Sequence, residues 1–455
     1  MRSDLLRFWC FRRVWSVRAP TVRLALVIML LLFYVFINNC ERDFSSIQIE
    51  HGSSNTTFEL SAEKVRAKEV WLNLRVKENS NQICIYRDSL KMFEGKIISH
   101  DTIIYDYNLS PKHEYSYIAY QVQNNTVVNS SLRIYVTTTE YEWNFLGLPD
   151  TFAVQLKVSE PYLYVCASIY GLWRTTILNP QMNWKYLGLA DTLSSKFSSR
   201  GVYDVLIHPD NSNVLLVGTA PEQAERHSIY KSFDGGDTWM NSDSGLGIIF
   251  ENYDPVYPSI YRFVVCPNHI LAGGAGLGFS VNFGEYWEYT PEGFAYLDVM
   301  EDHPKLPNIV WAGGEDFVSQ PLLYYSLNSG LNWTFVDITP IVGWLANVVS
   351  IGLDPIDENK VYVGSRWLLK TLDGGKNWSV ILKRYVRNIL IDSYNNRHIW
   401  VSGGSELFES WDGGETWDKL EDPIPEDAFI MDMIWHKNTE TIYMATLRGV
   451  YSLTP

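Results

Sequence analysis

The chain has 455 residues, a net charge of −15 at pH 7 and an aromatic content of 14%. Six arginines and one aspartate give the first 23 residues a charge of +5, so the remaining residues carry −20. Because a surface this acidic repels nucleic acid and anionic lipid headgroups, we expect no nucleic-acid partner, and an anionic ligand only where arginines cluster locally.

Residues 24–40 carry no charged side chain and begin with the apolar run Leu24–Ile37. Seventeen residues is the lower length limit for a membrane-spanning helix. Arginines precede the segment and acidic residues follow it, which predicts that residues 1–23 form a cytoplasmic tail. The residues before Cys40 are not the small ones that signal cleavage needs, so we expect an uncleaved signal-anchor, with a cleaved signal or a lipoprotein as alternatives. The later domains are then extracellular, lumenal or periplasmic.

Residues 45–139 contain short alternating segments that are typical of strands. The strands are expected at Val70–Val76, Ile83–Arg87, Thr102–Tyr107, Tyr115–Val122 and Leu132–Thr137. The stretch Leu109–Tyr117 resembles the fibronectin type III corner, in which Leu-x-Pro leads to a tyrosine that bonds back to the backbone. This resemblance implies a fibronectin type III-like β-sandwich with Trp71 as its core aromatic; another sandwich of immunoglobulin type is the alternative.

From residue 141 onward, an eight-residue pattern, Ser/Thr-x-Asp/Asn-x-Gly-x-x-Trp, occurs five times with tryptophan spacings of 48, 46, 45 and 39 residues. Asp or Asn close to Gly suits the backbone of a tight hairpin turn, and the Trp is expected to fill the gap between neighbouring sheets. The residues expected to build these turns are Ser232, Asp234, Gly236, Trp239, Asn282, Trp287, Asn328, Trp333, Asp373, Trp378, Asp412 and Trp417. A period of 40–50 residues without a helical pattern predicts a β-propeller.

These segments resemble the Asp-box (BNR) repeat of sialidases, sortilin-type receptors, oligoxyloglucan-cleaving glycosidases and photosystem II assembly propellers. The resemblance implies a fold and not a chemistry. Seven tryptophans open strands at the repeat period: 143, 184, 239, 287, 333, 378 and 417. The strand near Trp143 lacks a preceding partner and the strand Gly449–Leu453 lacks a following one, so we expect the two to pair. The prediction is an all-β protein with a seven-bladed propeller over residues 141–455, preceded by the sandwich and one transmembrane helix.

A glycoside hydrolase would need two carboxylates across an aromatic-lined cleft. The candidate acids are Asp254, Glu315 and Asp316, and the candidate ligand-binding aromatics are Tyr253, Tyr257, Phe317, Trp344 and Trp367. The chain lacks the Arg-Ile-Pro-like triplet of sialidases, and its propeller arginines show no pattern that maps onto a sialidase triad. We see no metal-ligand cluster, no Gly-rich phosphate loop and no nucleophile triad, so no cofactor or metal is expected.

Two covalent features complete the sequence. Five cysteines are too few for a disulfide framework, and Cys84, Cys166 and Cys266 are expected to be buried free thiols. Candidate N-glycosylation sites are Asn55, Asn124, Asn129, Asn332 and Asn377.

The sequence thus predicts a membrane-tethered propeller that binds a glycan or a polypeptide on one face. A glycoside hydrolase and an assembly factor or scaffold for a membrane protein complex are the two alternatives.

Overall fold

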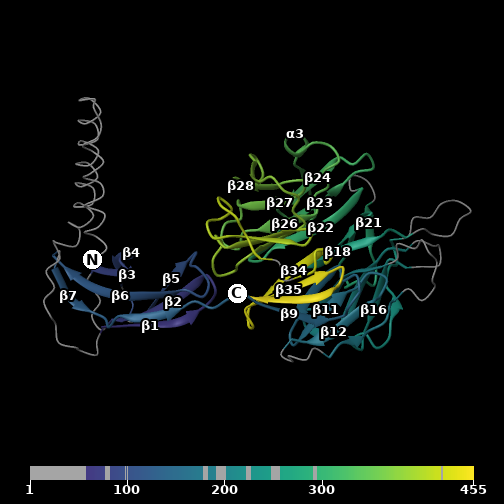
Figure 1. The fold of residues 1–455 in the computed structure, drawn as a ribbon. Coiled ribbons are helices and arrows are strands. Elements are labelled where there is room, and N and C mark those ends of the chain that lie inside the picture. Colours follow the sequence, from purple (N-terminus) through teal and green to yellow (C-terminus); the bar gives the residue numbers. More distant parts are fainter. Residues whose placement is uncertain are drawn as a thin grey trace, which may run out of the picture. The chain divides into compact units, whose positions relative to one another are not determined.

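The computed structural model describes residues 58–76, 82–97, 99, 101–124, 126–177, 183–190, 201–221, 227–246, 257–290, 295–421 and 424–455. The predicted cytoplasmic tail and membrane anchor lie outside these residues, as do Asn55, Tyr253 and Asp254. Within the described part of the chain, no helix is both long and apolar enough to cross a bilayer. The chain divides into two compact units, Met1–Glu140 and Tyr141–Pro455 (Figure 1).

The first unit contains two antiparallel sheets. One sheet has the order β1 (Phe58–Val65), β2 (Glu69–Val76), β5 (Asp101–Tyr107). The other has the order β4 (Leu90–Lys96), β3 (Gln82–Arg87), β6 (Glu114–Gln123), β7 (Thr126–Ser130), with β8 (Ile134–Thr137) also paired to β6. At the corner that leads into β6, the backbone N–H of Ser110 donates a hydrogen bond to the Tyr115 hydroxyl at 2.8 Å.

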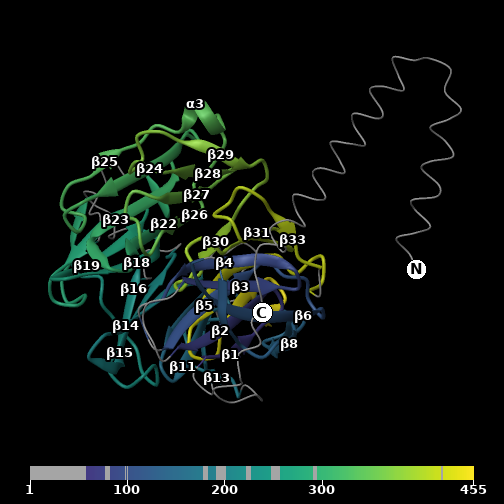
Figure 2. The same ribbon diagram turned by 90° about the vertical axis from the view of Figure 1, so that its left-hand side faces the viewer.

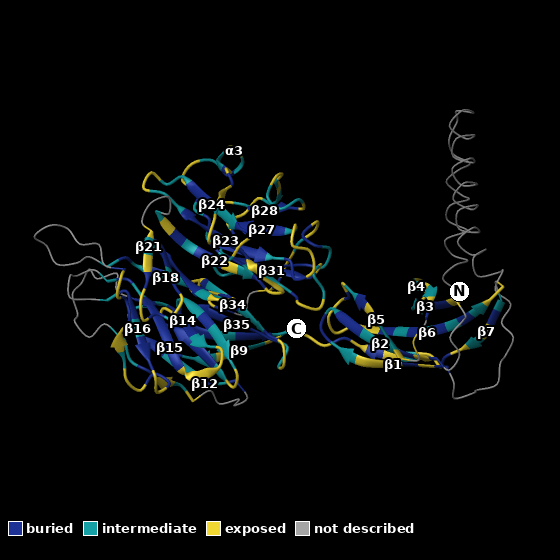
Figure 3. Cartoon of the chain, turned by 180° about the vertical axis from the view of Figure 1, so that it is seen from behind, coloured by how far each residue is buried: buried dark blue, intermediate teal, exposed yellow. Residues whose placement is uncertain are grey.

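The core of this unit lies between the inward faces of its strands, which Figure 3 shows as buried. On β2, the alternate residues Val70, Leu72 and Leu74 are fully buried. Trp71 therefore points to the other face of the strand, where its ring lies 5.1 Å from that of Tyr105. The prediction that Trp71 is the core aromatic is wrong, because the period of two assigns position 71 to the opposite side.

The second unit contains seven four-stranded antiparallel sheets, which we number in chain order. Sheets 1 to 3 are β10 (Gln155–Ser159), β11 (Tyr162–Cys166), β12 (Leu172–Thr176), β13 (Lys185–Tyr186); β14 (Val202–His208), β15 (Asn211–Thr219), β16 (Ile229–Ser232), β17 (Met240–Asn241); and β18 (Ile260–Cys266), β19 (His269–Gly274), β20 (Gly276–Ser280), β21 (Glu288–Thr290). Sheets 4 and 5 are β22 (Tyr296–His303), β23 (Leu306–Glu315), β24 (Pro321–Ser326), β25 (Thr334–Phe335); and β26 (Ser350–Leu353), β27 (Val361–Gly364), β28 (Leu368–Thr371), β29 (Ser379–Leu382), with the short helix α3 (Thr339–Val342) between them. Sheets 6 and 7 are β30 (Asn388–Ile391), β31 (Ile399–Gly403), β32 (Glu406–Ser410), β33 (Asp418–Lys419); and β34 (Ile430–His436), β35 (Thr441–Thr446), β36 (Gly449–Thr454), β9 (Glu142–Gly147).

The seven sheets form a closed ring. The first strand of each sheet contacts the first strand of the next, and β34 contacts β10 (Figures 1 and 2). The last sheet combines both ends of the unit, because β36 pairs with β9 in a register that places Leu453 opposite Trp143. The first and last strands of this unit are therefore hydrogen-bonded to each other within one sheet.

The five repeated segments form hairpin turns with the same hydrogen bonds. In the first, Ser232 Oγ accepts from the Gly236 N–H at 2.8 Å, and Asp234 accepts from the Thr238 N–H at 2.8 Å. Hydrogen bonds from the Thr238 hydroxyl, at 2.6 Å, and from the Thr238 N–H lower the pKa of Asp234 to about 2. Trp239 Nε1 donates to the Leu187 carbonyl of the preceding sheet at 2.6 Å, so the side chain joins two sheets.

Candidate functional site

One face of the ring carries the features that a ligand site requires. Because the strands of each sheet are antiparallel, the start of the first strand and the loop between the second and third strands lie at the same edge. The connection from each sheet to the next lies there too. We call this side of the ring the pocket face.

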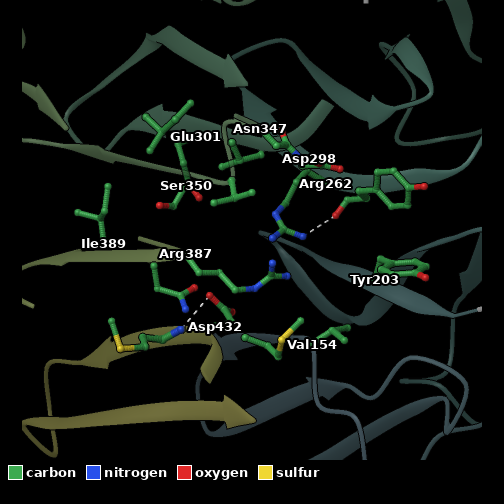
Figure 4. Close-up of a pocket in the computed structure, with 17 residues that line it drawn as sticks. Val154, Tyr203, Arg262, Asp298, Glu301, Asn347, Ser350, Arg387, Ile389 and Asp432 are labelled. Atoms are coloured by element: carbon green, nitrogen blue, oxygen red, sulfur yellow. Dashed lines mark hydrogen bonds between the residues drawn. The ribbon is translucent and has the colours of Figure 1, made fainter. Parts of the chain in front are cut away.

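A cavity of about 360 Å³ lies at the centre of the pocket face. It is lined by the beginnings of the innermost strands, and its polar side chains point inward from six sheets (Figure 4). The polar lining residues are Tyr203, Tyr261, Arg262, Asp298, Glu301, Asn347, Ser350, Arg387, Asn388 and Asp432.

Local irregularities in the strands aim several of these side chains into the cavity. The register of the innermost strand shifts near its start in four sheets: between Val202 and Asp204, Ile260 and Arg262, Leu297 and Val299, and Ile430 and Asp432. The residues skipped by these shifts are Tyr203, Tyr261, Asp298 and Met431, and all four line the cavity. β-Bulges often redirect side chains next to functional sites. Here a bulge recurs near the start of the innermost strand in four sheets, and the residues that it redirects line the cavity.

Three carboxylates at the centre of the ring accept hydrogen bonds from neighbouring segments; Asp204 is buried, and Asp298 and Asp432 are half-buried. Asp204 of β14 accepts a hydrogen bond from the Phe263 N–H of β18 at 2.7 Å, and Asp432 of β34 accepts one from the Leu156 N–H of β10 at 2.7 Å. Asp298 of β22 accepts one from the Asn347 amide. Burial raises the pKa of all three acids. Their oxygens hold the ring together, so these acids are structural.

Glu301 also faces the centre, and its carboxyl group differs from these three. Its side chain lines the central cavity and is accessible to solvent there. Burial raises its pKa to about 7. The positive charges of Lys157 and Arg262 lower the pKa, and the negative charges of Asp302 and Asp432 raise it. No hydrogen bond of the Glu301 side chain is seen within the described residues.

Substitution Glu301→Gln is expected to stabilise the protein at pH 8 more than at pH 5. A carboxyl whose pKa rises on folding binds protons more tightly in the folded state than in the unfolded state. Glu301 therefore lowers the free energy of unfolding progressively as the pH rises from about 4.5 to about 7. Urea denaturation of both proteins at pH 5, 6, 7 and 8 measures the difference, with Glu358→Gln, exposed on the opposite face, as the control. A stability difference that is the same at all four pH values would contradict this.

Exposed aromatic side chains surround the cavity. Seven of them lie in loops or strand starts of the pocket face: Phe152, Tyr170, Tyr296, Phe317, Trp344, Tyr385 and Phe429. Phe317 (81% exposed), Val318, Trp344 (54% exposed) and Leu345 lie in two neighbouring loops, and we call these four residues the rim patch. The Leu345 N–H donates to the Ser319 carbonyl at 2.9 Å, which holds its two loops side by side.

The sequence candidates fall into three places. Phe317 and Trp344 lie together on the rim patch. Glu315 ends β23 on the same face, but Asp316 folds back on its own loop, accepting from the Val318 and Gln320 N–H groups at 2.9 and 2.7 Å. Neither acid lines the central cavity, so the structure does not bring them together as a pair across a cleft.

The remaining candidates lie elsewhere. Tyr257 is half-buried beside His227, at a ring distance of 5.2 Å, in a separate cavity on the side of the ring. Trp367 is half-buried in the loop between β27 and β28. Cys84, Cys166 and Cys266 are buried free thiols, as the sequence predicted.

The candidate glycosylation sites within the described residues differ in their surroundings. Asn124, Asn332 and Asn377 are exposed, whereas Asn129 is partly buried. The Asn377 amide donates to Asp373 at 2.7 Å within its turn.

Sequence reasoning missed the central residues Arg262, Arg387, Asn347 and Ser350. Each lies within three residues of the start of an innermost strand and directly beside an aromatic or β-branched residue. Their position near the start of the first strand of a repeat is the signal that the sequence offers. The propeller arginines show no pattern that maps onto a sialidase triad, and no other arginine site is predicted from the sequence.

No family model matches the chain, and no curated protein matches it. Among solved structures, YCF48 bound to D1 peptide superposes with a TM-score of 0.51 and 13% identity, covering 69% of this chain and 96% of that chain. YCF48 from Cyanidioschyzon merolae gives 0.48 and 12%, over 69% and 98%. A GH74 enzyme from Niastella koreensis gives 0.38 and 15%, over 85% and 62%. The ring is a β-propeller. At these identities the likeness shows the fold alone, and the predicted propeller is confirmed.

Proposed function

We propose that this protein is a binding protein whose propeller holds a polypeptide ligand on the pocket face. The observation that carries the proposal is the combination, on one face, of a central polar cavity and the rim patch. Exposed apolar patches with a polar surround mark interaction sites in soluble domains. Pockets with a few convergent polar groups are the usual location of ligands.

The composition of the rim patch favours a polypeptide over a glycan. Sugar rings stack on flat aromatic surfaces, but Val318 and Leu345 are aliphatic and stand beside Phe317 and Trp344. Such a mixed surface suits apolar side chains. YCF48, whose solved structure has the same fold, is bound to a D1 peptide, and this supports a peptide as the ligand class.

We further propose that the seven sheets are the blades of a seven-bladed Asp-box propeller. A fibronectin type III-like domain over residues 45–139 and a signal-anchor over residues 24–40 would present it outside the cytoplasm. The hairpin turns described above support the Asp-box propeller, and the Tyr115 corner supports the fibronectin type III-like domain.

Substitutions on the pocket face are expected to remove binding. The probe is a pool of synthetic dodecapeptides of mixed sequence, passed over the immobilised full chain in detergent, with retained peptides counted by mass spectrometry. We expect Phe317→Ser with Trp344→Ser to lower retention about ten-fold or more. The double variant Phe233→Ser with Leu372→Ser is the control, because it removes exposed apolar side chains from the turns of the opposite face.

Equal retention by the pocket-face variant and the native chain would contradict the proposed function. A release of reducing sugar from oligosaccharides by the native chain would instead favour the glycoside hydrolase.

A further inference from the structure

Two arginines from distant parts of the chain extend their guanidinium groups into the same central cavity (Figure 4). Arg262, on β18, donates hydrogen bonds to Gln155 Oε1 and, at 2.8 Å, to the Tyr261 carbonyl. Arg387, just before β30, donates no side-chain hydrogen bond within the described residues, and its buried Nε has no partner. Buried polar groups in folded proteins nearly always have partners, so this donor points to a ligand.

The carboxylates around the cavity attract the two arginines but form no hydrogen bond with them within the described residues. Asp298 attracts both guanidinium groups, and Glu301 and Asp432 attract that of Arg262. Asp432 accepts hydrogen bonds from the Leu156 and Met433 N–H groups at 2.7 and 2.9 Å, and Asp298 accepts from Asn347. Over the ranges that the structure describes, neither guanidinium forms an ion pair. The two arginines thus retain hydrogen-bonding capacity toward an anion, although the protein as a whole is acidic.

Two further atoms in the same cavity lack partners. Asn347 Oδ1 and Ser350 Oγ are buried and make no hydrogen bond. The Asn347 amide nitrogen donates to Asp298, which leaves the amide oxygen as the atom without a partner. An amide oxygen is an acceptor only. The buried cavity atoms without a partner are therefore a donor of Arg387, the Ser350 hydroxyl and the Asn347 oxygen, and the Glu301 carboxyl lies in the same cavity. A carboxylate next to a peptide N–H complements this set, because the arginines can bind the acid and the Asn347 oxygen can accept from the N–H.

We propose that Arg262 and Arg387 form a subsite for one carboxylate of a polypeptide that lies across the pocket face. The inference rests on the proposed function and adds the chemistry of its ligand. Planar guanidinium groups match carboxylates through paired, charge-assisted hydrogen bonds. The apolar residues that flank the acid in the ligand would lie on the rim patch. Arg366, in the loop between β27 and β28, is exposed on the same face. The carboxylate comes either from an Asp or Glu side chain or from the free C-terminus of the ligand.

Three dodecapeptide pools, otherwise identical in composition, test the subsite on the immobilised full chain. The first has one central Glu and an amidated C-terminus. The second has Gln at that position and a free C-terminal carboxylate. The third has Gln and an amidated C-terminus, so it carries neither acid. Retention by the native chain is compared with that by Arg387→Gln, which removes no side-chain hydrogen bond found in the described part of the chain, and by Arg384→Gln.

Arg384 is the matched control because it is exposed, lies three residues away and is already paired with Glu406 at 2.8 Å. We expect the native chain to retain the first or the second pool about ten-fold more than the third. Arg387→Gln should abolish that excess and Arg384→Gln should keep it. The pool that shows the excess identifies the source of the carboxylate.

Equal retention of all three pools by the native chain would overturn the subsite while leaving polypeptide binding intact. An excess that survives Arg387→Gln would overturn it as well. Retention of none of the pools would overturn the proposed function and the subsite with it.

Discussion

Replacing Trp287 with alanine is expected to lower the free energy of unfolding by about 3–5 kcal/mol. The side chain is fully buried, and its indole Nε1 donates to the Ser242 carbonyl of the preceding sheet at 2.8 Å. It packs in one cluster with Phe263, whose ring centre lies 6.3 Å away. The substitution leaves a cavity between two sheets and a carbonyl without its donor. Urea denaturation followed by circular dichroism measures the loss.

The control for this prediction is Trp239→Ala at the equivalent position of the preceding repeat. Trp239 also bonds to the preceding sheet, through the Leu187 carbonyl, but it is only partly buried. A smaller loss than for Trp287 is therefore expected. If the two variants lost equal stability, burial between the sheets would not be the source of the effect.

Asp204→Ala is expected to destabilise the ring by about 2–5 kcal/mol, because it leaves two buried backbone donors without an acceptor. Asp204 accepts from the Phe263 and Val205 N–H groups, each at 2.7 Å. The first of these bonds crosses from sheet 2 to sheet 3. Thermal and urea denaturation of the variant measure the effect.

Asp204→Asn separates this hydrogen bonding from the charge. The amide oxygen can still accept from one of the two N–H groups, but the amide nitrogen cannot accept from the other, which Asp204 bonds through its second oxygen. The substitution also removes a carboxyl whose pKa burial has raised. We expect it to cost less than the alanine variant, because one of the two hydrogen bonds is kept. A loss larger than that for alanine would contradict this account of the hydrogen bonds.

The sequence predicted the repeat because each copy is a local structure. The Ser, Asp and Gly of each turn bond to one another within eight residues, so the pattern of residues reports the hairpin directly. Trp184 lies at the repeat period outside the five copies, yet it behaves like Trp239 and Trp287, since its Nε1 donates to the Leu146 carbonyl of another sheet at 2.9 Å. The closing strand could be expected on similar grounds, because Trp143 and Gly449–Leu453 each lacked a neighbour in the repeat.

The pocket could not be predicted in the same way, because it arises from residues that are distant along the chain. Arg262 and Arg387 meet only because the ring closes. The bulges that aim Tyr203 and Tyr261 inward also break the period of two that assigns side chains to faces. Asp316 is a candidate acid in the sequence because it adjoins an aromatic residue. An acid in a loop often accepts hydrogen bonds from backbone N–H groups of its own turn, and Asp316 does so here.

The most direct test of polypeptide binding on the pocket face is photocrosslinking from that face. The photoreactive residue p-benzoylphenylalanine replaces Phe317 in one full-length variant and Phe233, on the opposite face, in another. Each variant is irradiated with the mixed dodecapeptide pool, and adducts are identified by mass spectrometry. We predict peptide adducts at position 317 that Arg387→Gln diminishes, and few at position 233. Adducts that are equal at the two positions, or found only at 233, would contradict binding on the pocket face.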